Sequence, residues 1–353
     1  MAIFILLTIL ALLGCFIDSN RFQKTYYALL LVMMMCISGA RSINVGPDTH
    51  NYILVYSKIA GIWSNEFLFF GIMQLLKSYG FRPVEIQFAF SMVTFIPLIL
   101  LLLKKSNNIA ISVLVYIFAY NIYFFETMNI VRQSCALPYL LWSIVLLSEK
   151  KYVKSAIMFI ISIGFHTSSI FAIPMIVLSY LYRPSLRTAT IILFITMIIG
   201  FTTTISQIVG LIDLLSSFKF LNIERYATYS EWHTDRSKYF TLLFIIIVPA
   251  SICAFYSYKQ YSQSIITRIY FYSVALNNIL CVLPNGFRAT FCLVALEILL
   301  YPLIIRNKDK KINIIVLSSL LFLIAVTDFV RLPSPPSKNS KWFVPYEIDR
   351  GII

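Results

Sequence analysis

Four basic side chains are set into or directly beside long apolar stretches: Arg41, Arg132, His166 and Arg288. Ionisable groups in such surroundings are energetically costly, so they mark candidate functional sites. A planar guanidinium donates two parallel hydrogen bonds and suits a phosphate or diphosphate group. An imidazole exchanges a proton near neutral pH. These residue types predict an anion-binding site at which a proton is transferred.

The segment after Arg41 combines turn and cap residues in the order Gly46-Pro47-Asp48-Thr49-His50-Asn51-Tyr52. It predicts a turn and then a helix that Asp48 or Thr49 caps and that continues through Tyr52. Two roles are open for Arg41. It could clamp an anion, or it could extend from the end of a span toward the membrane interface as a structural residue.

Arg132 lies shortly after Glu126, at the start of an apolar run. It could pair with Glu126 or with a backbone carbonyl, or it could clamp a phosphate in an outer cavity. The next residue, Gln133, could hydrogen bond a sugar hydroxyl or cap a neighbouring helix. Arg288 follows a Pro-Asn-Gly turn, and both an anion clamp and an interfacial arginine are open for it.

His166 follows Gly164 at the midpoint of the apolar run 152–182 and precedes three hydroxyl residues, Thr167, Ser168 and Ser169. It could be a structural hydrogen-bond donor or a general base. The other two histidines lie in loops and have weaker claims to a catalytic role. The three stand far apart, and no loop contains an Asp-x-Asp pair. The sequence therefore predicts no metal site.

Composition places the chain in the membrane. Hydrophobic residues make up 59% and charged residues 12% of the 353 residues, against roughly 25% charged residues in soluble domains. We expect an all-α polytopic membrane protein in which residues 1–353 form a single integral membrane domain. The net charge of +14 resides largely in short loops, as topology control requires, and no nucleic-acid partner is expected. No Gly-rich phosphate loop of an ATPase is present.

Hydrophobic runs of near-membrane length predict the spans; they fall at 2–17, 25–40, 85–103, 109–125, 130–148, 152–182, 188–206, 239–258, 265–283, 289–305 and 312–329. The run 152–182 is too long for one ordinary span and short for two. If it is a short-armed hairpin, all of the dense basic loops lie on one side, as the positive-inside rule favours. A single span would divide them between the two sides. The hairpin gives about 12 transmembrane segments, with His166 at the bottom of a cavity open to the periplasm.

The outer face then carries three longer segments. The loop 41–84 includes an apolar helix at 66–79 that is suited to lie on the membrane surface. The loop 207–238 is rich in tyrosine and charge, and the tail 330–353 contains four prolines that favour an extended chain. Aromatic side chains in these two segments could stack on sugar rings or serve as ordinary interfacial residues.

The order of these motifs resembles that of the EpsG/Wzy-type polysaccharide polymerases. The resemblance is carried by Arg41 with Gly46–Tyr52, by Ile130-Val131-Arg132-Gln133, by Phe165-His166-Thr167-Ser168, by Phe287-Arg288 and by the Pro345-Tyr346 ending. It covers nearly the whole chain. The family's Gly-x-Asp-Thr motif carries proline at position 47 here.

The resemblance implies a GT-C-like architecture and an active site that faces the periplasm from the bacterial inner (cytoplasmic) membrane. It implies that undecaprenyl-diphosphate-linked glycans serve as donor and acceptor in a glycosyl transfer that needs no metal or other cofactor. Membrane lipids are expected partners, and a chain-length regulator is a further candidate partner.

The roles of individual residues follow from this chemistry as hypotheses. Without a metal, arginines must stabilise the charge of the leaving diphosphate, and the candidates are Arg41, Arg132 and Arg288. His166 is the candidate base for the acceptor hydroxyl, with Asp48 as the alternative. Gln133 and Tyr52 are candidates for contacting the glycan.

Three other functions remain open from the residues alone: a lipid-linked oligosaccharide flippase or exporter, a membrane acyltransferase that modifies the glycan, and a non-catalytic lipid-glycan binding protein. A transporter would more often show internal repeats and paired broken helices, and the sequence has one broken segment. An acyltransferase would also use a membrane histidine, but the arginines fit a lipid diphosphate better.

Overall fold

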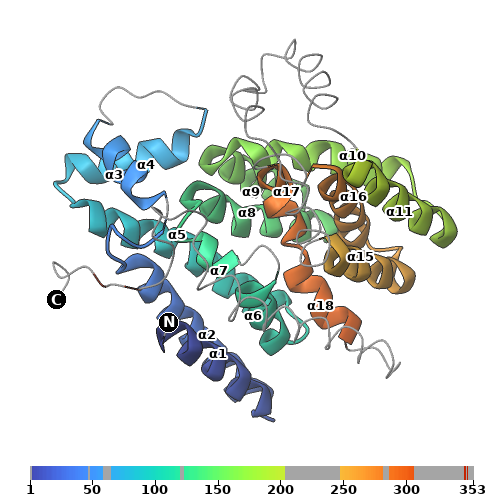
Figure 1. Ribbon diagram of the computed structural model, residues 1–353, viewed down its shortest axis with the longest axis horizontal. Coiled ribbons are helices and arrows are strands. Elements are labelled where there is room, and N and C mark those ends of the chain that lie inside the picture. Colours follow the sequence, from blue (N-terminus) through green and yellow to red (C-terminus); the bar gives the residue numbers. More distant parts are fainter. Residues whose placement is uncertain are drawn as a thin grey trace. The chain divides into compact units, whose positions relative to one another are not determined.

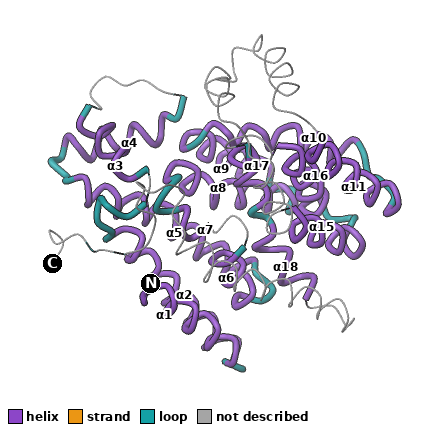
Figure 2. Tube along the Cα trace, in the orientation of Figure 1, coloured by secondary structure: helices purple, strands orange, loops and turns teal. Residues whose placement is uncertain are grey.

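The computed structural model describes residues 2–46, 48–58, 65–119, 123–202, 247–280 and 286–305, together with Tyr346 and Ile348. Within these ranges every regular element is a helix, which confirms the predicted all-helical class (Figures 1 and 2). The one β interaction among them is an isolated antiparallel bridge between Arg41 and Ile348. The helices form two compact units, residues 1–170 with 295–353, and residues 171–294.

The first unit contains ten labelled helices among its described residues: α1 (Ala2–Leu13), α2 (Asn20–Gly39), α3 (Thr49–Ser57), α4 (Phe67–Ser78), α5 (Pro83–Lys105), α6 (Ile109–Phe118), α7 (Tyr123–Glu126), α8 (Val131–Ser148), α9 (Tyr152–Phe165) and α18 (Glu297–Ile305). Helix α5 packs between α2 and α8, and α8 packs most extensively on α9. Helix α6 is buried along its whole length and contacts α18. This packing gives the unit an apolar core.

Helices α8 and α9 form a tight pair joined by residues 149–151, where Lys150 adopts a φ of 60°. A connection this short makes two helices antiparallel neighbours. Ser143 of α8 donates to the Ser155 carbonyl of α9 at 2.9 Å, which ties the two helices together near the connection. As a result, the beginning of α8 and the end of α9 lie at the same end of the pair.

The second unit contains α10 (Ala172–Leu181), α11 (Leu186–Thr202), α15 (Val248–Tyr261), α16 (Ile265–Leu280) and α17 (Phe287–Val294). Helix α16 contacts the other four. Its Asn278 donates to Ser251 of α15 at 3.2 Å and to Thr196 of α11 at 3.4 Å. Polar side chains of this kind join helices in an apolar environment because no water competes for their hydrogen bonds.

Two of the described helices, α5 and α8, are long and apolar enough to cross a membrane. A third candidate consists of Arg288–Val294 and Glu297–Ile305 taken together, and several shorter helices are also apolar. The run 152–182 is interrupted at His166, as predicted: α9 ends at Phe165, and a 3₁₀ turn at Thr167–Phe171 precedes α10. The predicted loop 207–238 lies outside the described residues, as does the tail 330–353 except for Tyr346 and Ile348.

Candidate functional site

The antiparallel pair of α8 and α9 brings Arg132 and His166 to one end of the first unit. Arg132 is in the first turn of α8, and His166 is the extended residue that ends α9. Helix α4 packs on α9, and it does so closely because Gly164 has no side chain. A Cβ placed at Gly164 would lie 2.7 Å from Cγ of Leu68. The glycine therefore allows the beginning of α4 to reach His166.

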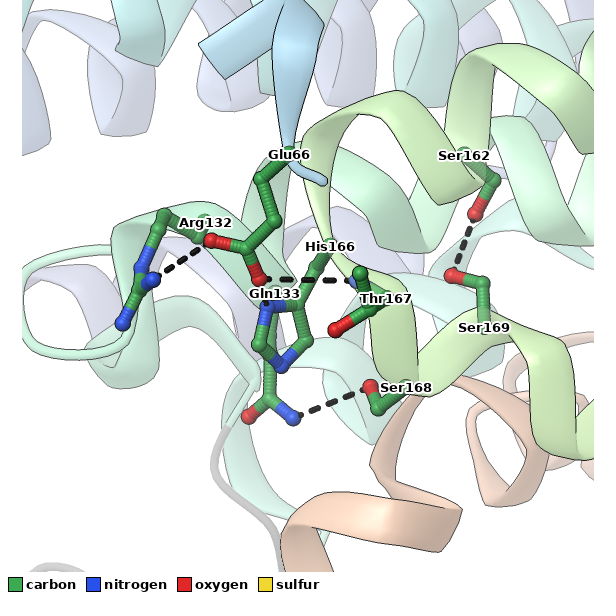
Figure 3. Close-up of polar contacts among 8 residues, drawn as sticks. All are labelled: Glu66, Arg132, Gln133, Ser162, His166, Thr167, Ser168 and Ser169. Atoms are coloured by element: carbon green, nitrogen blue, oxygen red, sulfur yellow. Dashed lines mark hydrogen bonds and ion pairs between the residues drawn. The ribbon is translucent and has the colours of Figure 1, made fainter. Parts of the chain in front are cut away.

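Glu66, the residue before α4, connects the two predicted site residues (Figure 3). One carboxylate oxygen contacts His166 Nδ1 and accepts the backbone N–H of Thr167 at 3.4 Å. The other accepts from Nη1 of Arg132 at 2.5 Å. A single carboxylate thus pairs with a histidine and an arginine from two helices.

The Glu66 carboxylate is buried, with 5% of the residue exposed. Burial by itself raises its pKa, but the hydrogen bond and charge of His166, and then Arg132, lower the pKa to about 2. The group is therefore ionised at neutral pH. An ionised carboxylate against Nδ1 orients the imidazole and stabilises the positive charge that develops when the ring takes up a proton. The arrangement suits His166 to general base catalysis.

Hydroxyl and amide groups surround this carboxylate–histidine pair. Gln133 Nε2 donates to Ser168 Oγ at 3.2 Å. Ser162 and Ser169 share a hydrogen bond of 2.7 Å (Figure 3). Ser162 also donates to the Ala136 carbonyl at 3.0 Å. These contacts fasten the turn after His166 to α8 and α9, so they fix the position of the imidazole.

Tyr52 links this network to Arg41. It lies on α3, forms a side-chain hydrogen bond with Arg132 and lines the same small cavity as Arg41. Arg41 is 2% exposed. Its guanidinium donates to the Ser38 carbonyl and, at 3.5 Å, to the Thr49 hydroxyl. Among the described residues it makes no ion pair.

Burial has the largest effect on the pKa of the Arg41 guanidinium. It lowers the pKa of the guanidinium to about 10, although Tyr346 and Tyr52 act in the opposite direction. Tyr346 donates to the Ile37 carbonyl at 2.6 Å, so this residue is held at the end of α2. A buried cation without a carboxylate in the described part of the chain is a suitable partner for an anionic group.

The Gly46–Tyr52 motif forms the predicted turn and helix. Gly46 has a φ of +90°, and a Cβ there would lie 2.0 Å from the Met128 carbonyl oxygen, so only glycine fits. The helix begins at Thr49, and Asp48 occupies the N-cap position without a side-chain capping bond. Thr49 hydrogen bonds to the Val45 carbonyl at 2.6 Å and to the Met128 carbonyl at 3.2 Å. The motif therefore fastens α3 to the segment before α8.

A small cavity of about 20 Å³ lies beside Arg41 and Tyr52 and is lined by residues of α3, α4 and α5. That volume has room for about one water molecule. Gln87 lines this cavity and is 9% exposed. Neither amide atom of Gln87 has a hydrogen-bond partner in the described ranges. Buried polar groups are normally paired, so Gln87 is a candidate for binding a water molecule or one small polar group of a ligand.

Two structural interpretations of the arginines are wrong. Arg132 pairs with Glu66 and not with Glu126, whose carboxylate accepts from Asn129 at 3.0 Å. Arg41 does not extend toward the interface, because it is buried. Arg288 is in the first turn of α17 and belongs to the second unit. Nowhere in the described ranges do three or more His, Cys, Asp or Glu side chains cluster as metal ligands would.

Sequence reasoning missed Glu66 and Gln87. Glu66 is the first residue of the apolar helix predicted at 66–79, and a carboxylate at the start of such a helix could have suggested a buried partner. Gln87 lies in the first half of the long apolar helix α5. A lone amide in that context carries little signal, because amides also cap and join helices.

The profile of the EpsG family matches residues 24–348, which is most of the chain. The chain belongs to the EpsG family. EpsG is a Wzy-like polymerase family, so the protein has a role in the biosynthesis of polysaccharides at a membrane. Comparison with curated protein sequences and with solved structures gives no match.

Membership in the EpsG family gives the network around Glu66 a chemical context. The family implies glycosyltransferase-like polymerase chemistry. Such chemistry requires one group that orients or deprotonates an acceptor hydroxyl and another that stabilises the charge of the leaving group. The first unit contains side chains of both chemical types: the carboxylate–histidine pair, and two arginines, of which Arg132 bonds to Tyr52 and Arg41 lines the same small cavity as Tyr52.

Proposed function

We propose that this EpsG-family protein polymerises undecaprenyl-diphosphate-linked oligosaccharide repeat units into O-antigen or another surface polysaccharide. The reaction would take place without a metal at the periplasmic face of the inner membrane, in a protein of about 12 spans with a GT-C-like architecture. The observation that carries the proposal is the contact of one buried carboxylate, Glu66, with both His166 and Arg132.

The proton transfer is assigned to His166. The acceptor hydroxyl attacks the anomeric carbon of the donor glycan, its proton passes to Nε2 of His166, and the bond from carbon to the undecaprenyl diphosphate oxygen breaks. Glu66 contacts Nδ1 and stabilises the imidazolium that forms. Asp48 is the alternative base, but it lies at the start of α3 and is not part of the carboxylate–histidine pair.

Arginines are assigned to stabilise the negative charge of the leaving diphosphate. Arg41 is buried and lacks a carboxylate partner within the described chain. Arg132 holds Glu66 through Nη1, while 26% of its side chain is exposed, so part of the guanidinium can reach a phosphate. Arg288 is a further candidate from the second unit. Gln133 and Tyr52 are assigned to contact the glycan. Gln133 hydrogen bonds to Ser168, and Tyr52 hydrogen bonds to Arg132.

The decisive experiment is complementation of a strain that lacks the gene, with the surface polysaccharide resolved on a gel. Wild type should restore a ladder, and His166→Ala should leave single repeat units although the protein is present in the membrane. His50→Ala is the matched control, because His50 is exposed on α3 outside the network. The lipid-linked repeat units should be extracted from both faces of the membrane in the same samples.

The rival functions give different results. Lipid-linked units that accumulate on the cytoplasmic face, with even the single-unit form lost from the surface, would identify a flippase. An unchanged ladder with altered acetylation would identify an acyltransferase. A ladder of normal length from His166→Ala would overturn the assignment of His166 as base.

A further inference from the structure

The second unit contains an open cavity of about 440 Å³ at the end where α10 leads into α11 and where α15 ends. The residues that line it are Arg183, Pro184, Ser185, Leu186, Tyr258, Lys259 and Ser262. Two of the seven are cations and three carry hydroxyl groups, which is the donor chemistry that recognises a phosphate. All of them belong to the second unit, so the cavity is separate from the network around Glu66.

Hydrogen bonds to backbone carbonyls fix the positions of residues that line the cavity. Tyr258 of α15 donates to the Pro184 carbonyl at 2.7 Å, and Tyr272 of α16 donates to the Tyr182 carbonyl at 2.9 Å. These bonds fix the connection 182–185 against two helices. Arg183 is held by neutral groups, since it donates to the Gln263 side-chain oxygen at 2.5 Å and to the Ser262 hydroxyl at 3.1 Å.

Uncompensated positive charge surrounds this cavity. The described residues of the second unit include no aspartate or glutamate. Arg268 lies close enough to act electrostatically on Tyr258 together with Arg183. Its Nε atom is buried and has no hydrogen-bond partner within the described residues. Two cations therefore line the cavity and a third lies near Tyr258, and no carboxylate among the described residues of this unit neutralises them.

Apolar side chains border the basic cavity. Leu181 is 77% exposed, and Tyr182 and Leu186 are also exposed. Arg183, Lys259 and Arg268 belong to the basic loops that the positive-inside rule assigns to the cytoplasmic side. A polar, positively charged cavity beside exposed apolar side chains matches a phospholipid, whose headgroup carries a phosphate and whose chains are apolar.

We propose that this cavity binds the phosphate headgroup of an anionic phospholipid from the cytoplasmic leaflet. The phosphate would contact Arg183 and Lys259, and the acyl chains would lie along Leu181 and Leu186. A soluble phosphate compound shares the headgroup chemistry but lacks the chains. Binding of a lipid here does not depend on the function proposed for the first unit.

The test uses the full-length protein in nanodiscs of phosphatidylcholine with increasing phosphatidylglycerol, with bound lipid counted by native mass spectrometry. The double variant Arg183→Gln/Lys259→Gln should bind phosphatidylglycerol roughly 100-fold more weakly than wild type, because it removes two charge-assisted contacts with the phosphate. The matched control is Lys150→Gln/Lys154→Gln, which removes the same charge from exposed positions in another basic loop. It should bind as wild type does.

Three outcomes would overturn the proposal. Equal losses in the two double variants would mean attraction to the surface as a whole. Competition by inorganic phosphate or glycerol phosphate at concentrations equal to those of the lipid would mean a site for soluble phosphates. Wild type that shows no preference for phosphatidylglycerol over phosphatidylcholine would mean that the cavity holds no anionic lipid. The preference of wild type can be measured without any variant, so a variant that fails to fold does not obscure the answer.

Discussion

Glu66→Gln is the substitution that tests the site most directly, because it removes one negative charge and keeps the shape of the side chain, while one acceptor oxygen becomes a donor NH2 group. Glu66 compensates His166 and Arg132 in a place where only 5% of the residue is exposed. Arg132 would then lose its ion-pair partner, and the imidazole of His166 would lose the carboxylate that orients it. We expect a loss in the free energy of unfolding and a separate loss in the rate of polymerisation.

The size of the stability loss follows from the pKa of the carboxyl group. The folded protein lowers this pKa from 4.5 to about 2, which corresponds to roughly 3 kcal/mol. Because the folded value is the lower one, this stabilisation is fully present above pH 4.5. It disappears as the pH falls from 4.5 toward 2. Glu66→Gln should therefore lose roughly 3 kcal/mol at neutral pH and should lack this contribution to acid sensitivity.

The rate loss follows from the role of His166. A general base contributes about 10²–10⁴-fold to a rate. Glu66 orients the imidazole and stabilises the imidazolium that forms, without touching the substrate. We expect Glu66→Gln to lower polymerisation within that range. Groups that act as one unit give strongly non-additive effects. The double variant Glu66→Gln/His166→Gln should therefore be no slower than the slower single variant.

The assay combines thermal and acid unfolding of the purified protein with timed synthesis of the polysaccharide ladder. Asp18→Asn is the matched control, because Asp18 is an exposed carboxylate before α2 and lies outside the network. It should leave both stability and rate unchanged. The reasoning is refuted if Glu66→Gln polymerises at the wild-type rate, or if the effects of the Glu66 and His166 substitutions on the rate simply multiply.

Three further substitutions test other parts of the site. His166→Ala should lower the polymerisation rate by about 10²–10⁴-fold while His50→Ala does not, as measured by the ladder in a complemented strain. Arg132→Lys should lose most polymerisation because an ammonium cannot reproduce the guanidinium fork; wild-type ladders from it would favour a role for charge alone. Gly164→Ala should lower the free energy of unfolding by about 1–3 kcal/mol, because its Cβ would meet Leu68 at 2.7 Å. Addition of Leu68→Ala should recover part of this loss in thermal unfolding, and a failure to recover any would contradict the close packing of α4 on α9.

The local features of the molecule were predictable from the sequence. Apolar runs predicted helices close to the observed ones, for example 85–103 for α5 and 130–148 for α8. The Gly46–Tyr52 motif predicted the turn and the start of α3, and the interruption at His166 was also predicted. These features depend on residues close together in the chain, where hydropathy and backbone preferences act directly.

The partners of the site residues were decided by the tertiary structure alone. Glu66 meets His166 across 100 positions and Arg132 across 66, whereas the sequence offered the nearby Glu126 as the partner of Arg132. The periodicity of a helix shows which face is apolar but not which other helix will cover it. The contact exists because a short connection folds α9 back on α8 and because Gly164 admits α4. The surroundings of Arg41 similarly include Tyr346, which bonds to Ile37 across 309 positions, and no local pattern specifies this contact.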